Sequence, residues 1–152
     1  MNKKNISTPI NEQFYLKRKA LLCSVLGVFF IADFIYSCFI KSSVELEWLT
    51  FILFVAVIIL MVIFLKSMSK IGRSVFWIGN FKDEYLNHIH NKGYKYSLSL
   101  VGLFLIAVTI TSSIFPMPFA TLPLHEFSKF TAGLMFVSYG FPILLLMRGD
   151  DE

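Results

Sequence analysis

The sequence predicts an all-α polytopic membrane protein with four transmembrane helices. Hydrophobic residues make up 56% of the 152 residues and charged residues only 16%, against roughly 45–50% and about 25% in soluble domains. The mean hydropathy is +0.68. The hydrophobic residues also fall into four long blocks, a pattern that excludes a soluble enzyme, a disordered chain and a disulfide-stapled secreted module.

Each of the four blocks is long enough to cross a bilayer as a helix. They occupy about residues 20–40, 48–65, 97–115 and 130–147, within a single transmembrane domain of residues 1–152. A hydrocarbon core of about 30 Å requires roughly 20 helical residues. We therefore expect a four-helix bundle in the membrane, connected by a loop at residues 66–96 and two smaller connections on the other side.

The positions of lysine and arginine predict how the helices are oriented. Of the 14 such residues, only Lys41 and Lys129 lie in the two connections on the outer side. Because basic residues of short loops stay on the cytoplasmic side, both termini and the loop 66–96 are predicted to be cytoplasmic. The basic residues are also expected to contact anionic lipid headgroups, so the net charge of +4 requires no direct binding of nucleic acid.

Asp33 is the charged residue of the first span, and the other three spans have none. An ionisable group there costs about 2.5–3.5 kcal/mol on insertion scales, so it normally marks an ion or proton pathway or a contact between helices. We expect Asp33 to be protonated or exposed to water, since no basic residue lies inside a span. The residues expected beside it are Tyr36, Ser37, Thr109, Thr111, Ser112, Ser113 and Tyr139, and the alternative is that it only holds helices together.

The loop 66–96 divides into two predicted segments. Residues 66–81 form a basic amphipathic stretch that suits the headgroup layer and extends the second span. Asn80 is expected to cap a new helix that begins at Phe81 and continues into the third span, with carboxylates in its first turn. The side chains expected to contact lipid or a cytoplasmic partner are Lys66, Lys70, Arg73, Asp83, Glu84, His88, Lys92 and Lys95.

Small residues recur on the third and fourth spans and predict close helix packing. They include Ser99, Gly102, Thr109 and Ser113 on the third span, and Gly133 and Gly140 on the fourth. Packing within one chain is favoured over an oligomer face, because a bundle needs such contacts in any case. Pro142 is expected to kink the fourth span, and the outer connection before that span to form only a short helical turn through His125.

No metal site, cofactor or catalytic motif is predicted. His88 and His90 diverge by roughly 200° on a helix, so they cannot chelate one ion together. Cys23 and Cys38 stand too far apart on one helix to form a disulfide and are expected to be packing residues. The sequence also lacks the common metalloprotease, phosphate-loop and hydrolase motifs, and we therefore expect no enzyme activity.

The segment Asp83 to Tyr94 reads D-E-Y-L-N-H-I-H-N-K-G-Y. It resembles the Asp-Glu-Arg-x-x-x-Ile-x-x-Lys-Ala signature of small prokaryotic four-span membrane proteins of unknown function, although Tyr85 stands where that family has Arg. The residues that match in type are Asp83, Glu84, Ile89, Lys92 and Gly93. The resemblance covers the second half of the chain and implies a juxtamembrane helix before the third span, with no activity. The size and number of spans also suit the membrane subunit of a two-gene phage-defence system of the Kiwa type.

Two functional hypotheses follow. The first is a non-enzymatic, homo-oligomeric protein of the cell inner membrane that acts as anchor or sensor for a cytoplasmic protein partner, because most soluble surface and charge lie on that side. The second is a small channel or carrier in which Asp33 binds a proton or cation. A membrane-permeabilising pore is a variant of the second hypothesis.

Overall fold

The computed structural model describes residues 9–39, 44–68, 75, 79–114 and 123–148. These residues form four helices: α1 (Pro9–Phe39), α2 (Val44–Met68), α4 (Glu84–Ile114) and α5 (Leu124–Arg148). All four are long and apolar enough to cross a membrane. The predicted all-α class with four helices of membrane-spanning length is therefore confirmed.

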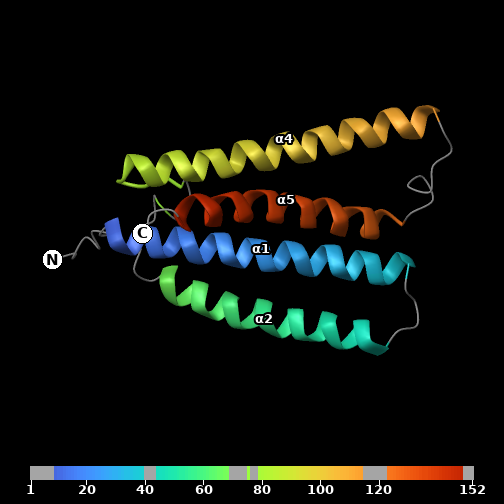
Figure 1. Cartoon of the computed structure of the whole chain (residues 1–152), viewed down its shortest axis with the longest axis horizontal. Coiled ribbons are helices and arrows are strands. Elements are labelled where there is room, and N and C mark those ends of the chain that lie inside the picture. The colour runs from blue at the N-terminus through green and yellow to red at the C-terminus, as the bar shows by residue number, and fades with distance from the viewer. Residues whose placement is uncertain (1–8, 40–43, 69–74, 76–78, 115–122, 149–152) are drawn as a thin grey trace.

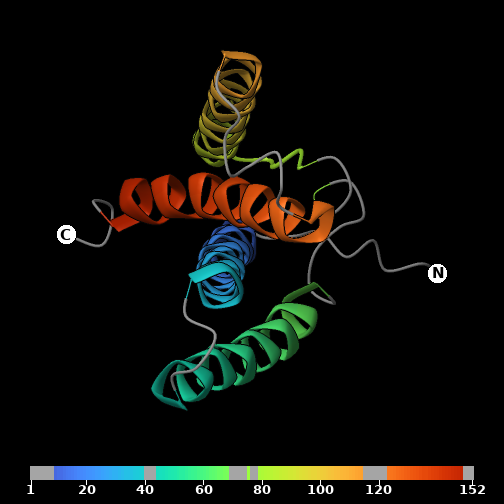
Figure 2. The same cartoon turned by 90° about the vertical axis from the view of Figure 1, so that its right-hand side faces the viewer.

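The four helices alternate in direction and lie in a row, in the order α2, α1, α5, α4 (Figures 1 and 2). The central helices α1 and α5 form the largest interface, while α2 packs mainly on α1 and α4 mainly on α5. Figure 2 shows α5 crossing α1 obliquely. The bundle is therefore open, because α2 and α4 lie on its two outer sides.

Nearly all described basic residues lie towards the end where α1 begins, α2 ends, α4 begins and α5 ends (Figure 1). We call it the basic end, and its described basic residues are Lys17, Arg18, Lys19, Lys66, Lys82, Lys92, Lys95 and Arg148. The most buried side chains gather at the same end, among them Tyr15, Leu16, Ile89, Ile143 and Met147. In the described ranges, the other end of the row, which we call the opposite end, has Lys129 as its basic residue.

Helix α5 begins earlier than predicted. Residues 124–129 were expected to belong to the outer connection, with only a short turn, but they form the first turns of a helix that continues through Pro142 to Arg148. Pro123 precedes this helix, and its carbonyl accepts the backbone N–H groups of Glu126 at 3.0 Å and Phe127 at 3.2 Å. Proline suits the start of a helix because it has no N–H group, and the first N–H groups of a helix have no partner inside the helix.

Asp83, not the predicted Asn80, caps α4. The Asp83 carboxylate accepts the backbone N–H of Tyr85 at 2.8 Å, which is the usual capping bond. Residues before Asp83 are held out of the helix, because the Asn87 amide group binds both the N–H and the carbonyl of Phe81, at 2.8 and 2.6 Å. Gly79, with φ of 69°, turns the chain just before this point.

The predicted amphipathic stretch 66–81 is described only in part. Helix α2 extends the second span as far as Met68. Lys70 and Arg73 lie outside the described residues.

Glycine residues bring α1 and α5 close together. A Cβ atom added at Gly27 would lie 2.7 Å from the carbonyl oxygen of Gly133, and one at Gly140 would meet the backbone of Ala20. Gly133 and Gly140 thus contact α1 within the chain, and Gly27 is the partner that the sequence pattern missed. Gly102 differs, since an added Cβ there meets nothing within 4 Å among the described residues.

Candidate functional site

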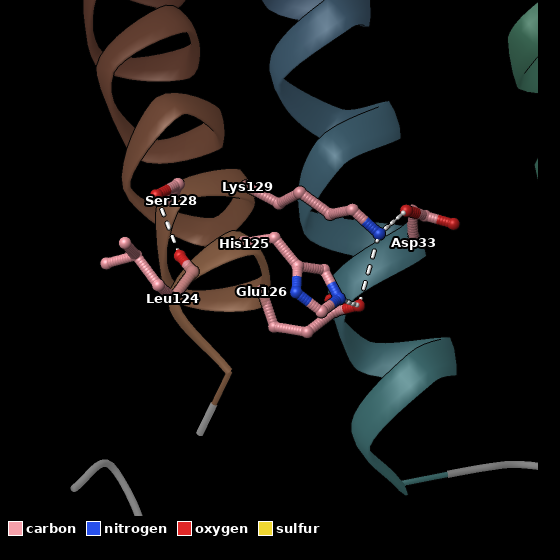
Figure 3. A network of polar contacts seen from close by, with 6 residues as sticks. All are labelled: Asp33, Leu124, His125, Glu126, Ser128 and Lys129. Carbon is pink, nitrogen blue, oxygen red and sulfur yellow. Dashed lines mark hydrogen bonds and ion pairs between the residues drawn. The ribbon is translucent and has the colours of Figure 1, made fainter. Parts of the chain in front are cut away.

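Two polar clusters join the helices, one at each end of the row. At the opposite end, the Lys129 ammonium of α5 lies 2.8 Å from Asp33 Oδ2 of α1 (Figure 3). The same ammonium lies 3.2 Å from Glu126 Oε1, and His125 Nε2 lies 3.1 Å from that oxygen. This cluster ties the first turns of α5 to the last two turns of α1.

One residue expected beside Asp33, Tyr139, lies instead at the basic end of the row. Thr109 and Thr111 donate hydrogen bonds to carbonyls of their own helix, at Leu105 and Ala107. Tyr139 lies in the cluster at the basic end, and the side chains of Ser112 and Ser113 lie outside the described residues. Tyr36 and Ser37 are half-buried one turn further along α1.

Lys129 supplies the cation that was predicted to be missing. It lies on the second turn of α5 because that helix begins at Leu124, and its side chain reaches back to Asp33 (Figure 3). The Asp33 and Lys129 side chains are 30% and 31% exposed, respectively. A contact of 2.8 Å between an ammonium and a carboxylate is a charge-assisted hydrogen bond.

Glu126 is the more buried carboxylate of this cluster, with a side chain only 10% exposed. Its Oε1 atom is close to both Lys129 and His125, whereas its Oε2 atom is buried and has no hydrogen-bond partner among the described residues. Burial of a carboxylate oxygen without a donor is unfavourable, so this oxygen is suited to accept a hydrogen bond or to contact a cation. The sequence signal for a helix here was the spacing of Glu126 and Lys129 three residues apart, shortly after Pro123.

The cluster at the basic end joins α1, α4 and α5. The Tyr139 hydroxyl lies 2.7 Å from His90 Nδ1, and both side chains are buried. The Lys19 ammonium lies 5.3 Å from the ring centre of Tyr139 and 5.8 Å from that of Tyr94, within the range of cation–π contacts. His90 is 2% exposed while His88 is exposed, which confirms that the two histidines diverge.

Glu12 fixes the segment that precedes α4. Its side chain is fully buried, and Oε2 accepts the backbone N–H of Lys82 at 2.8 Å. On the other side of α1, Arg18 donates a hydrogen bond to the Ser67 hydroxyl of α2. Glu12 was not predicted as a site residue, because the first span was expected to begin only at residue 20. The available signal was a single acidic residue in the strongly basic stretch before the first span.

The residues predicted to contact lipid or a partner divide by exposure. Lys66, Glu84, His88 and Lys95 are exposed, Lys92 is half-buried, and Asp83 serves as the cap of α4.

Among the small residues, Ser99 is exposed on α4. Cys23 and Cys38 are free thiols. Within the described ranges, no three His, Cys, Asp or Glu side chains are grouped so that they could hold a metal ion.

A scan against protein-family models, a search of curated proteins and a search of solved structures each found no match. The resemblance of Asp83 to Tyr94 to four-span membrane proteins therefore stays a prediction. Any function has to be inferred from the chain itself.

Proposed function

We propose that the chain is a non-enzymatic, homo-oligomeric protein of the cell inner membrane that anchors or senses a soluble cytoplasmic partner. In this proposal the basic end faces the cytoplasm, in keeping with the preference of lysine and arginine for that side. The observation that carries the proposal is the way residues 79–83 are held at the basic end, by Glu12 from α1 and by Asn87 from α4.

Such an arrangement suits the binding of a protein. The exposed side chains of Lys82, Glu84 and His88 follow one another on a backbone that hydrogen bonds from Glu12 and Asn87 already fix. A partner that binds a pre-ordered surface does not have to offset the loss of backbone entropy. Exposed charges of both signs then provide orientation and selectivity.

The test is purification from native membranes in a gentle detergent, followed by mass spectrometry of the proteins recovered. Charge reversal by Lys82→Glu together with Glu84→Lys should remove the partner while the chain still elutes as a folded species. Arg148→Glu, a charge reversal on α5, is the matched control and should retain it. Equal recovery of every co-purified protein from all three samples would contradict docking at this surface.

A second candidate function is the binding or transfer of a proton or cation at the opposite end. The observation that favours it is Glu126 Oε2, a buried carboxylate oxygen without a hydrogen-bond partner in the described ranges, beside a lysine that two carboxylates share. Glu126→Gln and Asp33→Asn should each reduce pH-driven flux into proteoliposomes, and Ser128→Ala is the control. Unchanged flux in both carboxylate variants would exclude this candidate.

A further inference from the structure

One face of α4 changes from basic to apolar along its length. Towards the basic end, a cavity of about 370 Å³ is lined by His88, Asn91, Lys92, Lys95 and Tyr96. Beyond Tyr96, a groove of about 420 Å³ runs between α4 and α5. Tyr96 lines both, so the cavity and the groove adjoin at this residue. Helices α4 and α5 are neighbours in both views of the molecule (Figures 1 and 2).

The two parts of this face have opposite chemistry. The cavity contains two lysine side chains, and no acidic residue is among the described residues that line it. The groove is lined by apolar groups, including Leu100 and Leu103 of α4 and Leu134 and Phe141 of α5.

We propose that this face binds an anionic glycerophospholipid, with the phosphate at Lys92 and Lys95 and an acyl chain in the groove. Basic pockets next to membrane-spanning helices on the cytoplasmic side recognise anionic headgroups. Tyr96 stands at the border between the two parts, where amphipathic aromatic residues normally meet the headgroup layer. The proposal requires the helices to span a bilayer, but it does not require the docking of a protein partner.

The dimensions agree with a lipid in one leaflet. From Lys92 to Leu103 the helix rises by about 16 Å at 1.5 Å per residue. Half of a hydrocarbon core of about 30 Å is about 15 Å. The headgroup and the acyl chain of one phospholipid would therefore reach both parts of this face at once.

The charges disfavour a second copy of the chain as the occupant of the groove. Two copies inserted in the same direction would place their basic cavities at the same depth. Their lysines at positions 92 and 95 would then face one another without described acidic residues in the lining. Like charges brought together in this way oppose association, whereas a lipid phosphate neutralises them.

Native mass spectrometry of the full chain in detergent tests the proposal, with phosphatidylglycerol and phosphatidylcholine as probes. The wild-type chain should retain phosphatidylglycerol preferentially. Lys92→Gln with Lys95→Gln should lower the affinity for phosphatidylglycerol by about tenfold and remove the preference, because each basic group near a lipid surface contributes to the attraction. Arg148→Gln, which removes one charge elsewhere at the basic end, should leave the affinity unchanged.

Three further measurements distinguish the contribution of the acyl chain to binding from that of the headgroup, and a lipid occupant from a protein occupant. Glycerol phosphate, which has no acyl chain, should not compete with phosphatidylglycerol. Ser99→Phe, which fills the groove, should weaken retention of both lipids, and size-exclusion elution checks that this variant folds. Retention of phosphatidylglycerol by the double lysine variant at the wild-type level would overturn the proposal. The proposal would also be overturned if a Leu103→Cys variant formed a disulfide-linked dimer whose yield did not fall when phosphatidylglycerol was added.

Discussion

Lys129 is shared by two carboxylates that come from different helices. Its contact with Asp33 joins α5 to α1, whereas its contact with Glu126 stays within one turn of α5. The Asp33–Lys129 pair is about one-third exposed, so its net contribution to stability is smaller than that of a fully buried pair. Its larger effect is to prevent two carboxylates from standing together without a cation.

We predict that Lys129→Met destabilises the protein more than Asp33→Asn does. Without Lys129, Asp33 and Glu126 lose their shared cation, at a cost of about 1–2 kcal/mol. In Asp33→Asn the lysine keeps Glu126, so the cost should be below about 1 kcal/mol. Thermal unfolding in detergent measures both effects, and the double variant should recover part of the loss. An equal loss in the two single variants would contradict the shared role of Lys129.

Tyr139 should contribute to stability through its hydroxyl group. Tyr139→Phe leaves buried His90 Nδ1 without the partner that now lies at 2.7 Å, which predicts a loss of about 1–3 kcal/mol. Tyr96→Phe removes a hydroxyl from an exposed tyrosine and serves as the control, with little change expected. The measurement is again thermal unfolding in detergent. Similar unfolding curves for the two variants would show that the contact with His90 adds nothing.

At the scale of elements, the spacing of α1 and α5 depends on glycine. We predict that Gly27→Ala destabilises the chain, because the added Cβ would lie 2.7 Å from backbone atoms of α5. Gly102→Ala is the matched substitution in open space and should be neutral or stabilising by up to about 1 kcal/mol through helix propensity. The two midpoints of thermal unfolding should therefore move in different directions or by clearly different amounts. The same loss from both would argue against a close α1–α5 contact.

The sequence was sufficient to predict the existence of four helices but not all of their ends. Long apolar blocks determine the helices, since a helix satisfies its backbone hydrogen bonds internally and is therefore the structure such a block adopts in an apolar environment. The start of α5 was missed because His125, Glu126 and Lys129 resemble a polar loop when they are taken singly. Their mutual contacts, and that of Lys129 with Asp33, come from the tertiary structure.

The candidate site was likewise predicted only in part. Asp33 was found from its charge inside an apolar block, but its partner could not be, because Lys129 lies almost one hundred residues further along the chain. The cap of α4 was assigned to Asn80 on local sequence alone. The choice of Asp83 depends on the turn at Gly79 and on the contact between Asn87 and Phe81. Neither feature follows from the helix propensity of the local sequence.

At the scale of the whole molecule, the separation of charge along the row predicts its direction in the membrane. In a chain with Cys23 and Cys38 replaced by serine, Lys82→Cys should react with an impermeant maleimide in inverted vesicles and not in intact cells. Ser128→Cys, at the opposite end, should show the reverse. Both side chains are exposed, so access to the reagent depends on the side of the membrane. Labelling of both cysteines from the same side would refute the up-and-down arrangement in the bilayer.

A row of helices leaves little space between its members: the cavity that Lys19, Tyr94 and Tyr139 line between α1, α4 and α5 is about 130 Å³. Each described helix packs mainly on one or two neighbours, an arrangement that favours a water-filled path between copies of the chain over one inside a single copy. If the carboxylates at the opposite end serve conduction, we therefore expect the lumen to form between several copies. The rate of flux would then rise more steeply than linearly with protein density in the vesicle, whereas a carrier that works as a monomer would give a linear dependence.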